Sequence, residues 1–377
     1  MNNQSTKIIP DEVETLHKQG QKYQNYRCYK SALYYYEKVI TQIESIPQGN
    51  YDVHQLKYHV YLEMADCYRE YKRLKAPKWV SEAEKLAKQL QDEAKTAMYL
   101  DRRSNIKRLD GDCKGALKGF KDSLDLKLKS SRGENIDVSN SCNNIGVMYT
   151  NLGKYREALD MYKKSLKKRS RIKGENDAGV ATLYNNIGGV YYNQDKYDKA
   201  LLMLKKSLKA SWTTFGKNYP SIAATYNNIA SVYHNQGKHD DALLKYNISL
   251  KIIQEQLGDN HPNAAKLYDN IGGVYDNQGK YDDAVSMYKK SLKIRLATTG
   301  NNHPSTTQSY RNIATIYRKQ SNYTQAIEFY QKSFDSLCYL YGENHPQVVK
   351  DKQILDQCRL LKSKANTSLW QDCSKSE

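Results

Sequence analysis

The sequence predicts an all-α solenoid, in which about eight helix-turn-helix repeats stack and one further helix caps the C-terminal end. Two observations predict this fold. The string Asn-Asn-Ile-Gly or a close variant recurs every 42 residues, and apolar residues follow each copy at helical spacing. A single two-helix unit cannot bury both of its faces, whereas stacked units share a continuous core.

The repeat register is kept without a slip over five copies. The first residues of the five copies are Asn143, Asn185, Asn227, Asp269 and Arg311. In the second copy, residues 184–191 carry apolar or small side chains at the i, i+3, i+4, i+7 spacing of one helical face. Residues 193–196 break the pattern, and a second stripe follows over 197–208. Gly188 and Ala200 are expected where the two helices approach closely.

The predicted organisation follows the regularity of the repeats. Residues 1–12 form a polar tail, 13–138 hold three divergent repeats, and 139–348 hold five regular ones. Residues 349–364 carry a further apolar stripe, which predicts the capping helix, and 365–377 are expected to be a flexible tail with Trp370 as a stray apolar residue. Prolines mark the joints between units, where the first turn of a helix needs no N–H.

Composition excludes several classes of function. No stretch approaches the ~20 apolar residues of a membrane span, and the polar N-terminus has no secretory apolar region. No phosphate loop, zinc-type His-Glu motif or nucleophile elbow is present. His261, His303 and His345 each precede a proline, and stacked repeats would hold them too far apart for one metal ion. We therefore expect no enzyme, no cofactor and no metal site, and these histidines are predicted to start helices.

The spacing of the small, aromatic and serine columns resembles that of the tetratricopeptide repeat (TPR). Gly146, Tyr149, Ala158, Tyr162 and Ser165 stand at offsets 0, 3, 12, 16 and 19. The 42-residue unit, with the joint 258–266 running on to Asp-Asn-Ile-Gly, resembles the TPR of kinesin light chains. This resemblance covers residues 13–348 and implies a cytoplasmic adaptor whose first helices line a concave groove. Kinesin light chains also carry a long heptad segment before their repeats. Only about a dozen residues precede the first predicted helix here, so a complete motor subunit is not expected.

The predicted binding site is a row of asparagines on the first helices. In related grooves this position binds the backbone of an extended peptide, because an amide both donates and accepts. Positive charge in the last two units suggests an acidic segment. Variable neighbours, among them Tyr192, His234 and Asp276, would form one rim. The alternative is that the asparagines link neighbouring repeats. The predicted groove residues are Asn144, Asn186, Asn228, Asn270, Asn312, Asn185, Asn227, Lys266, Arg311 and Arg318.

A second candidate surface is basic. The net charge is +18, and lysine pairs recur on the second helix of three units, which would form the convex side. These are Lys163, Lys164, Lys205, Lys206, Lys289 and Lys290. They fit either a solvated face or docking on an acidic polymer such as a microtubule, which would make the chain a structural cytoskeletal or ciliary protein. RNA is disfavoured, since no aromatic platform interleaves these lysines.

Overall fold

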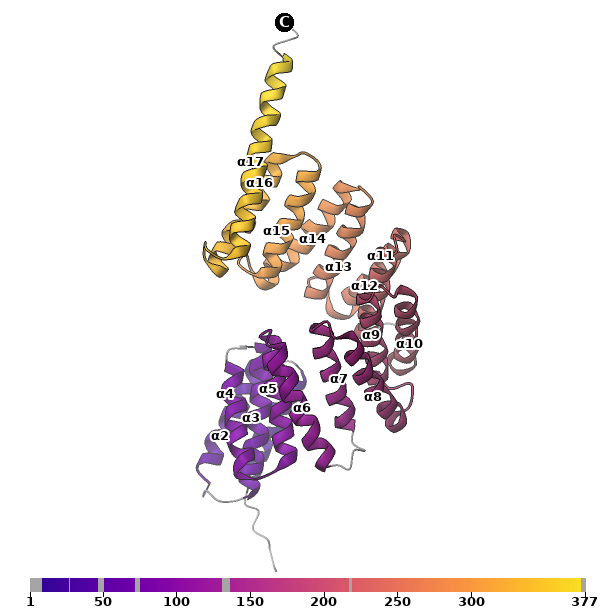
Figure 1. Cartoon of the computed structure of the whole chain (residues 1–377). Coiled ribbons are helices and arrows are strands. Elements are labelled where there is room, and N and C mark those ends of the chain that lie inside the picture. The colour runs from indigo at the N-terminus through magenta and orange to yellow at the C-terminus, as the bar shows by residue number, and fades with distance from the viewer. Residues whose placement is uncertain are drawn as a thin grey trace, which may run out of the picture. The chain divides into compact units, whose positions relative to one another are not determined.

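The computed structural model describes residues 9–26, 28–46, 51–71, 75–130, 136–216 and 219–373 (Figure 1). Within these residues the chain forms seventeen helices and no strand. The predicted all-α fold is confirmed, with eight consecutive helix pairs and one closing helix. Packing divides the chain into two compact units, residues 1–175 (the N-terminal unit) and 176–377 (the C-terminal unit).

The N-terminal unit contains four helix pairs, and each helix packs mainly on its neighbours in sequence. Val13, Ala32, Tyr36 and Val39 of the first pair belong to one core cluster, and Phe120 of the third pair packs with Ile145 and Met148 of the fourth. The helices are α1 (Asp11–Asn25), α2 (Tyr29–Glu44), α3 (Tyr51–Tyr71), α4 (Ala76–Gln89), α5 (Glu93–Leu109), α6 (Cys113–Ser130), α7 (Ile136–Asn151) and α8 (Tyr155–Lys173).

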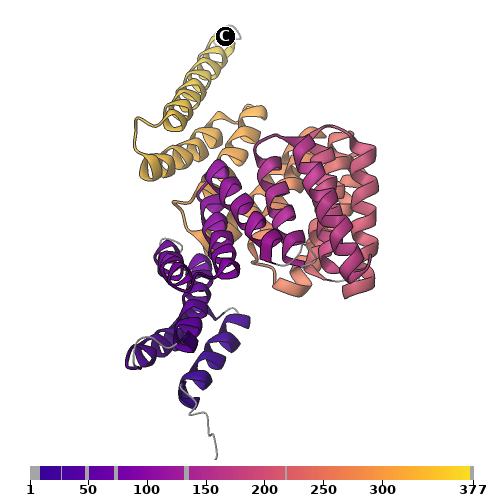
Figure 2. The ribbon, with the colours of Figure 1, turned by 60° about the horizontal axis from the view of Figure 1, so that its bottom comes forward.

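The C-terminal unit contains four more regular pairs and the closing helix. Its apolar core runs without a break from α10 through α14, and a second cluster joins α14 to α17. Figure 2 shows these helices from another side. They are α9 (Ala178–Asn193), α10 (Tyr197–Phe215), α11 (Pro220–Asn235), α12 (His239–Leu257), α13 (Pro262–Asn277), α14 (Tyr281–Thr299), α15 (Pro304–Lys319), α16 (Tyr323–Tyr341) and α17 (Pro346–Cys373).

The repeated serine of the second helix ties the two helices of a pair together. In four of the pairs its hydroxyl donates to a backbone carbonyl of the first helix, 26 residues earlier. Ser165 reaches the carbonyl of Ser139 at 2.7 Å, and Ser249 reaches that of Ala223 at 2.7 Å. Both serines are buried. A buried hydroxyl needs such a partner, which explains why a polar residue recurs in the core.

The turns inside the pairs require a left-handed backbone. Gly237 has φ of 74° and Gly279 has φ of 73°, whereas Asp195 and Ser321 occupy the equivalent place with φ of 57° and 58°. A residue with a Cβ pays a steric cost in this conformation. The repeat thus keeps its geometry even where its glycine has been replaced.

The closing helix is longer than the capping helix predicted from the sequence. It runs from Pro346 to Cys373, beyond residue 364 where the capping helix was predicted to end, and it includes most of the predicted flexible tail. Val348, Leu355 and Cys358 face the core of the last pair. The side chain of Trp370 lies outside the described residues. The predicted division at 138 follows repeat regularity, whereas packing divides the chain after 175.

Candidate functional site

The predicted asparagines of the C-terminal unit contact one another across neighbouring repeats. Asn228 Nδ2 donates to Asn185 Oδ1 at 3.0 Å, and Asn270 Nδ2 donates to Asn227 Oδ1 at 2.8 Å. Within α11, Asn227 Nδ2 lies 3.3 Å from Asn228 Oδ1. The four amides therefore form a continuous chain over α9, α11 and α13, which we call the inner ladder. This arrangement agrees with the linking role that the sequence left open.

A second row follows two helical turns further along the same helices. Asn235 Nδ2 donates to Tyr192 Oη at 2.9 Å, and Asn277 Nδ2 lies 2.8 Å from His234 Nε2. Lys319 Nζ pairs with Asp276 Oδ1 at 2.6 Å. These contacts form the outer ladder. The predicted rim residues are thus brought together, and each links one repeat to the next.

At Asp269 the inner ladder has a carboxylate, in the column where the earlier repeats carry asparagine. Asp269 instead binds Arg295 of α14, and Arg295 also donates to Ser309 Oγ at 3.0 Å. Burial raises the pKa of Asp269, against the opposing effect of the guanidinium. Asn312, one repeat on, accepts a hydrogen bond from Gln308 at 2.8 Å.

The same arrangement occurs four repeats earlier. Lys127 Nζ pairs with Asp101 Oδ2 at 2.5 Å and donates to Ser141 Oγ at 2.8 Å. Each of these residues stands 168 positions before its counterpart in the Asp269, Arg295 and Ser309 group. The sequence contains this pattern, because an acidic residue, a basic residue and a serine recur in the same three columns of the repeat. The pattern is not visible when each column is considered alone.

A cavity of about 410 Å³ lies in the C-terminal unit between α11 and α13. It brings together three predicted groove residues, Asn227, Asn270 and Lys266, with Asp269 and Arg295 beside them. Ser249 and Ile253 of α12 contribute to its lining. Lys266 is exposed, whereas the two asparagines are half-buried. Two half-buried amides and one exposed cation, Lys266, therefore line the cavity.

The remaining predicted groove residues have different surroundings. Arg311 Nη2 lies 3.5 Å from the buried carboxylate of Asp351, on the closing helix. Ser333 Oγ donates to the other oxygen of Asp351 at 2.9 Å. Arg318 is exposed and forms no ion pair with another described residue. In the N-terminal unit, Asn143 Nδ2 lies 3.5 Å from Asn144 Oδ1. In the C-terminal unit, Asn186 is half-buried on α9.

The six lysines of the predicted basic face are all exposed on second helices. Three of them lie over tyrosine rings of first helices: Lys206 over Tyr184, Lys289 over Tyr317 and Lys290 over Tyr268. Such contacts orient an ammonium group while leaving it in water.

The three histidines before prolines cap the helices that they precede. The ring Nδ1 accepts from the backbone N–H two residues on, at 3.1 Å for His261 and 3.2 Å for His303 and His345. Their predicted place at helix starts is confirmed. Within the part of the chain that the structure describes, no cluster of three potential metal ligands occurs.

Comparison with known proteins supports the repeat assignment. The tetratricopeptide repeat family model matches residues 137–211, 221–297 and 277–338, just over half of the chain. No curated protein matches the sequence. Among the described residues, no helix is long and apolar enough to cross a membrane.

Solved structures of similar fold span most of the chain. A Rap protein complexed with competence and sporulation factor aligns with 94% of this chain and 99% of its own, at 14% identity and a TM-score of 0.58. BtubC (BKLC) from P. vanneervenii aligns with 62% of this chain and 93% of its own, at 22% identity and a TM-score of 0.50. TPR-like repeats of a Podosopora anserina kinesin light chain align with 55% of this chain and 99% of their own, at 17% identity and a TM-score of 0.47.

Proposed function

Because the chain belongs to the tetratricopeptide repeat family, we propose that it is a non-enzymatic protein-interaction scaffold that binds an extended, acidic segment of a partner along its first helices. The C-terminal unit would hold this segment over α11, α13 and α15, in the manner of a cargo adaptor. The cytoplasm, including the cytoskeleton, is the proposed compartment.

The cavity between α11 and α13 carries this proposal. An asparagine amide has two N–H donors and an oxygen with two lone pairs. The inner ladder uses one N–H of Asn270, in its bond to Asn227, so hydrogen-bonding capacity remains for a peptide backbone. Lys266 stands exposed at the same cavity, which favours a carboxylate over a cation in the bound segment.

Charge reversal at Lys266 tests this proposal. Wild type and Lys266→Glu would capture partners from a native lysate, and binding of the captured segments would then be measured with purified protein. Lys205→Glu, which makes the same charge change on an exposed second-helix position, is the matched control. We expect Lys266→Glu to weaken binding of an acidic segment by about tenfold while Lys205→Glu leaves it unchanged. Equal effects of the two changes would refute the groove assignment.

A second candidate function is docking on an acidic polymer such as a microtubule, as part of a cytoskeletal or ciliary structure. The observation that favours it is the exposure of the six lysines on second helices. This function predicts salt-sensitive co-sedimentation with microtubules that is lost when Lys163, Lys164, Lys205 and Lys206 are changed to Glu. Co-sedimentation that survives these changes would exclude it.

A further inference from the structure

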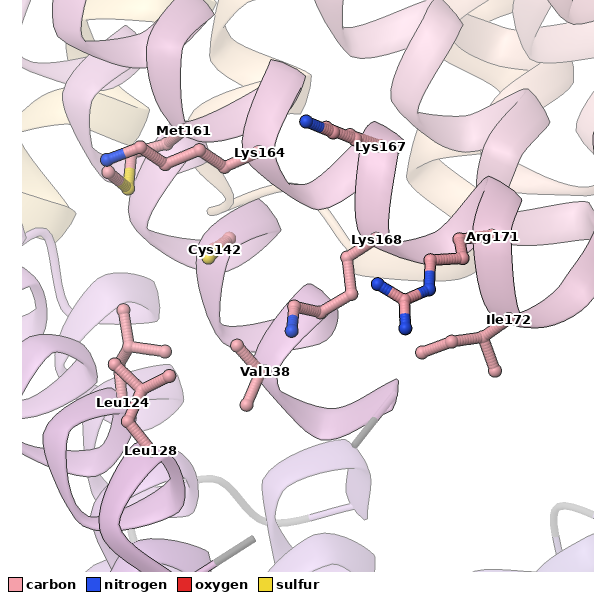
Figure 3. Close-up of a pocket in the computed structure, with 10 residues that line it drawn as sticks. All are labelled: Leu124, Leu128, Val138, Cys142, Met161, Lys164, Lys167, Lys168, Arg171 and Ile172. Carbon is pink, nitrogen blue, oxygen red and sulfur yellow. The ribbon is translucent and has the colours of Figure 1, made fainter. Parts of the chain in front are cut away.

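A second cavity, of about 490 Å³, lies in the N-terminal unit among α6, α7 and α8. Figure 3 shows Leu124 and Leu128 on α6 facing Val138 and Cys142 on α7, with the basic side chains of α8 around them. We call it the cationic pocket. Its lining residues are Leu124, Leu128, Val138, Cys142, Met161, Lys164, Lys167, Lys168, Arg171 and Ile172.

The pocket lies at a departure from the repeat. Cys142 stands in the column where the next four units carry Tyr184, Tyr226, Tyr268 and Tyr310. A thiol fills far less space than a phenol ring. In the units of α9 and α13, the lysine equivalent to Lys164 lies over this tyrosine: Lys206 over Tyr184 and Lys290 over Tyr268, both at 5.6 Å. At the pocket, both the ring and its contact with the lysine are absent.

The walls of the pocket combine apolar surface with ordered positive charge. Leu128 and Ile172 remain 44% and 40% exposed, so apolar surface lies open to solvent beside the cavity. Lys164, Lys167, Lys168 and Arg171 follow the i, i+3, i+4, i+7 spacing of one face of α8. They span about 10 Å along the helix axis. Lys164 and Lys167 form no ion pair with any other residue that the structure describes.

We propose that the cationic pocket is a second docking site, which takes an acidic protein segment whose apolar side chain enters the place of the missing tyrosine ring. Charge complementarity identifies the occupant. Four cations spread along two helical turns match several carboxylates on one chain, whereas the single carboxylate of a fatty acid reaches only an adjacent pair. Sites for small apolar ligands also enclose most of the ligand surface, and the exposure of Leu128 and Ile172 leaves this one open. The pocket is independent of the groove in the C-terminal unit.

The repeat itself supplies the test variant. Cys142→Tyr installs the residue of the four following units, so the fold is expected to be kept and the cavity filled. The probe is a short fluorescein-labelled peptide that carries leucines and glutamates at helical spacing. Its binding is measured by fluorescence anisotropy at low and moderate salt. Two control peptides carry glutamine for glutamate, or alanine for leucine. Thermal unfolding of each variant checks the fold.

Wild type should bind the leucine–glutamate peptide more tightly than either control peptide, and less tightly as salt rises. Cys142→Tyr and Lys164→Glu should each weaken binding by more than about tenfold. Lys206→Glu, the equivalent change beside Tyr184, should leave it unchanged. Absence of binding by wild type, or binding that survives Cys142→Tyr, would overturn the proposal. So would binding of oleate that Cys142→Tyr abolishes while the peptide does not bind.

Discussion

We propose that asparagines of the inner ladder have two roles, because they link neighbouring repeats and would also bind a partner segment. The asparagine of one repeat donates to that of the preceding repeat, as Asn228 does to Asn185 and Asn270 to Asn227. Two of these amides, Asn227 and Asn270, border the cavity in which we place a partner segment. A surface built in this way is pre-organised, because its hydrogen-bonding groups are already oriented before a ligand arrives.

The inner ladder should contribute measurably to stability. Asn228→Ala removes one bond to Asn185 and one to Asn227, and at about 1 kcal/mol for each net hydrogen bond it should lower the free energy of unfolding by about 1–2 kcal/mol. Asn312→Ala is the control, because Asn312 contacts the exposed Gln308 and should cost under about 0.5 kcal/mol. Urea unfolding followed by circular dichroism measures both. Equal midpoints for the two variants would contradict the linking role.

His234 should make the outer ladder sensitive to pH. Burial lowers its pKa, and the neighbouring His239 lowers it further. In the neutral ring Nε2 can accept from Asn277 Nδ2. Since the unfolded chain binds this proton more readily, the contribution of His234 to stability is complete above the ordinary histidine pKa and declines as pH falls below it.

The thermal midpoint should therefore drop between pH 7.5 and pH 5.5, and drop less in His234→Gln. His59, whose pKa burial also lowers, accounts for part of what remains. If wild type and His234→Gln lose the same number of degrees, the outer ladder does not titrate in this range.

At the scale of the helix pair, small residues set the distance between the two helices. A Cβ added to Gly188 would stand 2.8 Å from Leu204 Cγ, and one added to Gly146 would stand 2.6 Å from the ring of Tyr162. Leu204 and Tyr162 are both buried and cannot swing out. Glycine at these two positions is therefore a packing requirement of its pair, which agrees with the small residues expected where the two helices approach closely.

Two neighbouring glycines in α9 allow the effect of packing on stability to be measured separately from that of helix propensity. Gly188→Ala should destabilise the protein by about 1–3 kcal/mol through overpacking. At Gly189 an added Cβ would meet no atom within 4 Å, so Gly189→Ala should stabilise by about 0.5–1 kcal/mol. Chemical unfolding of both variants measures these effects. If Gly188→Ala raised the free energy of unfolding, or Gly189→Ala lowered it, close approach of the helices would not be the reason for the small residue at position 188.

At the scale of the whole molecule, periodicity carried most of the prediction. The columns of Gly146, Ala158 and Ser165 gave the number of pairs and their register, because a residue that repeats must do the same structural work each time. The histidines before prolines gave the helix starts. A contact that occurs in one repeat only cannot be predicted from periodicity. Arg311 was predicted for the groove and lies against Asp351 on α17, a partner that no column contains.

The cationic pocket is a second feature that periodicity alone does not predict. The departure at Cys142 is visible in the sequence, but whether the space left by a tyrosine is filled or open depends on the packing of α6 and α8 around it. The length of α17 was missed for a related reason. Its last turns carry no apolar stripe, and helical backbone can continue on propensity where packing no longer directs it.

The central claim is that partners contact the first helices of the C-terminal unit. Site-specific photocrosslinking tests it most directly. A benzophenone amino acid replaces either Ala224, exposed at the cavity between α11 and α13, or Leu202, 53% exposed on α10. We predict crosslinks to acidic partner segments from position 224, competed by the free segment, and none from position 202. Crosslinks from position 202 alone would place the binding surface on the second helices and contradict the account.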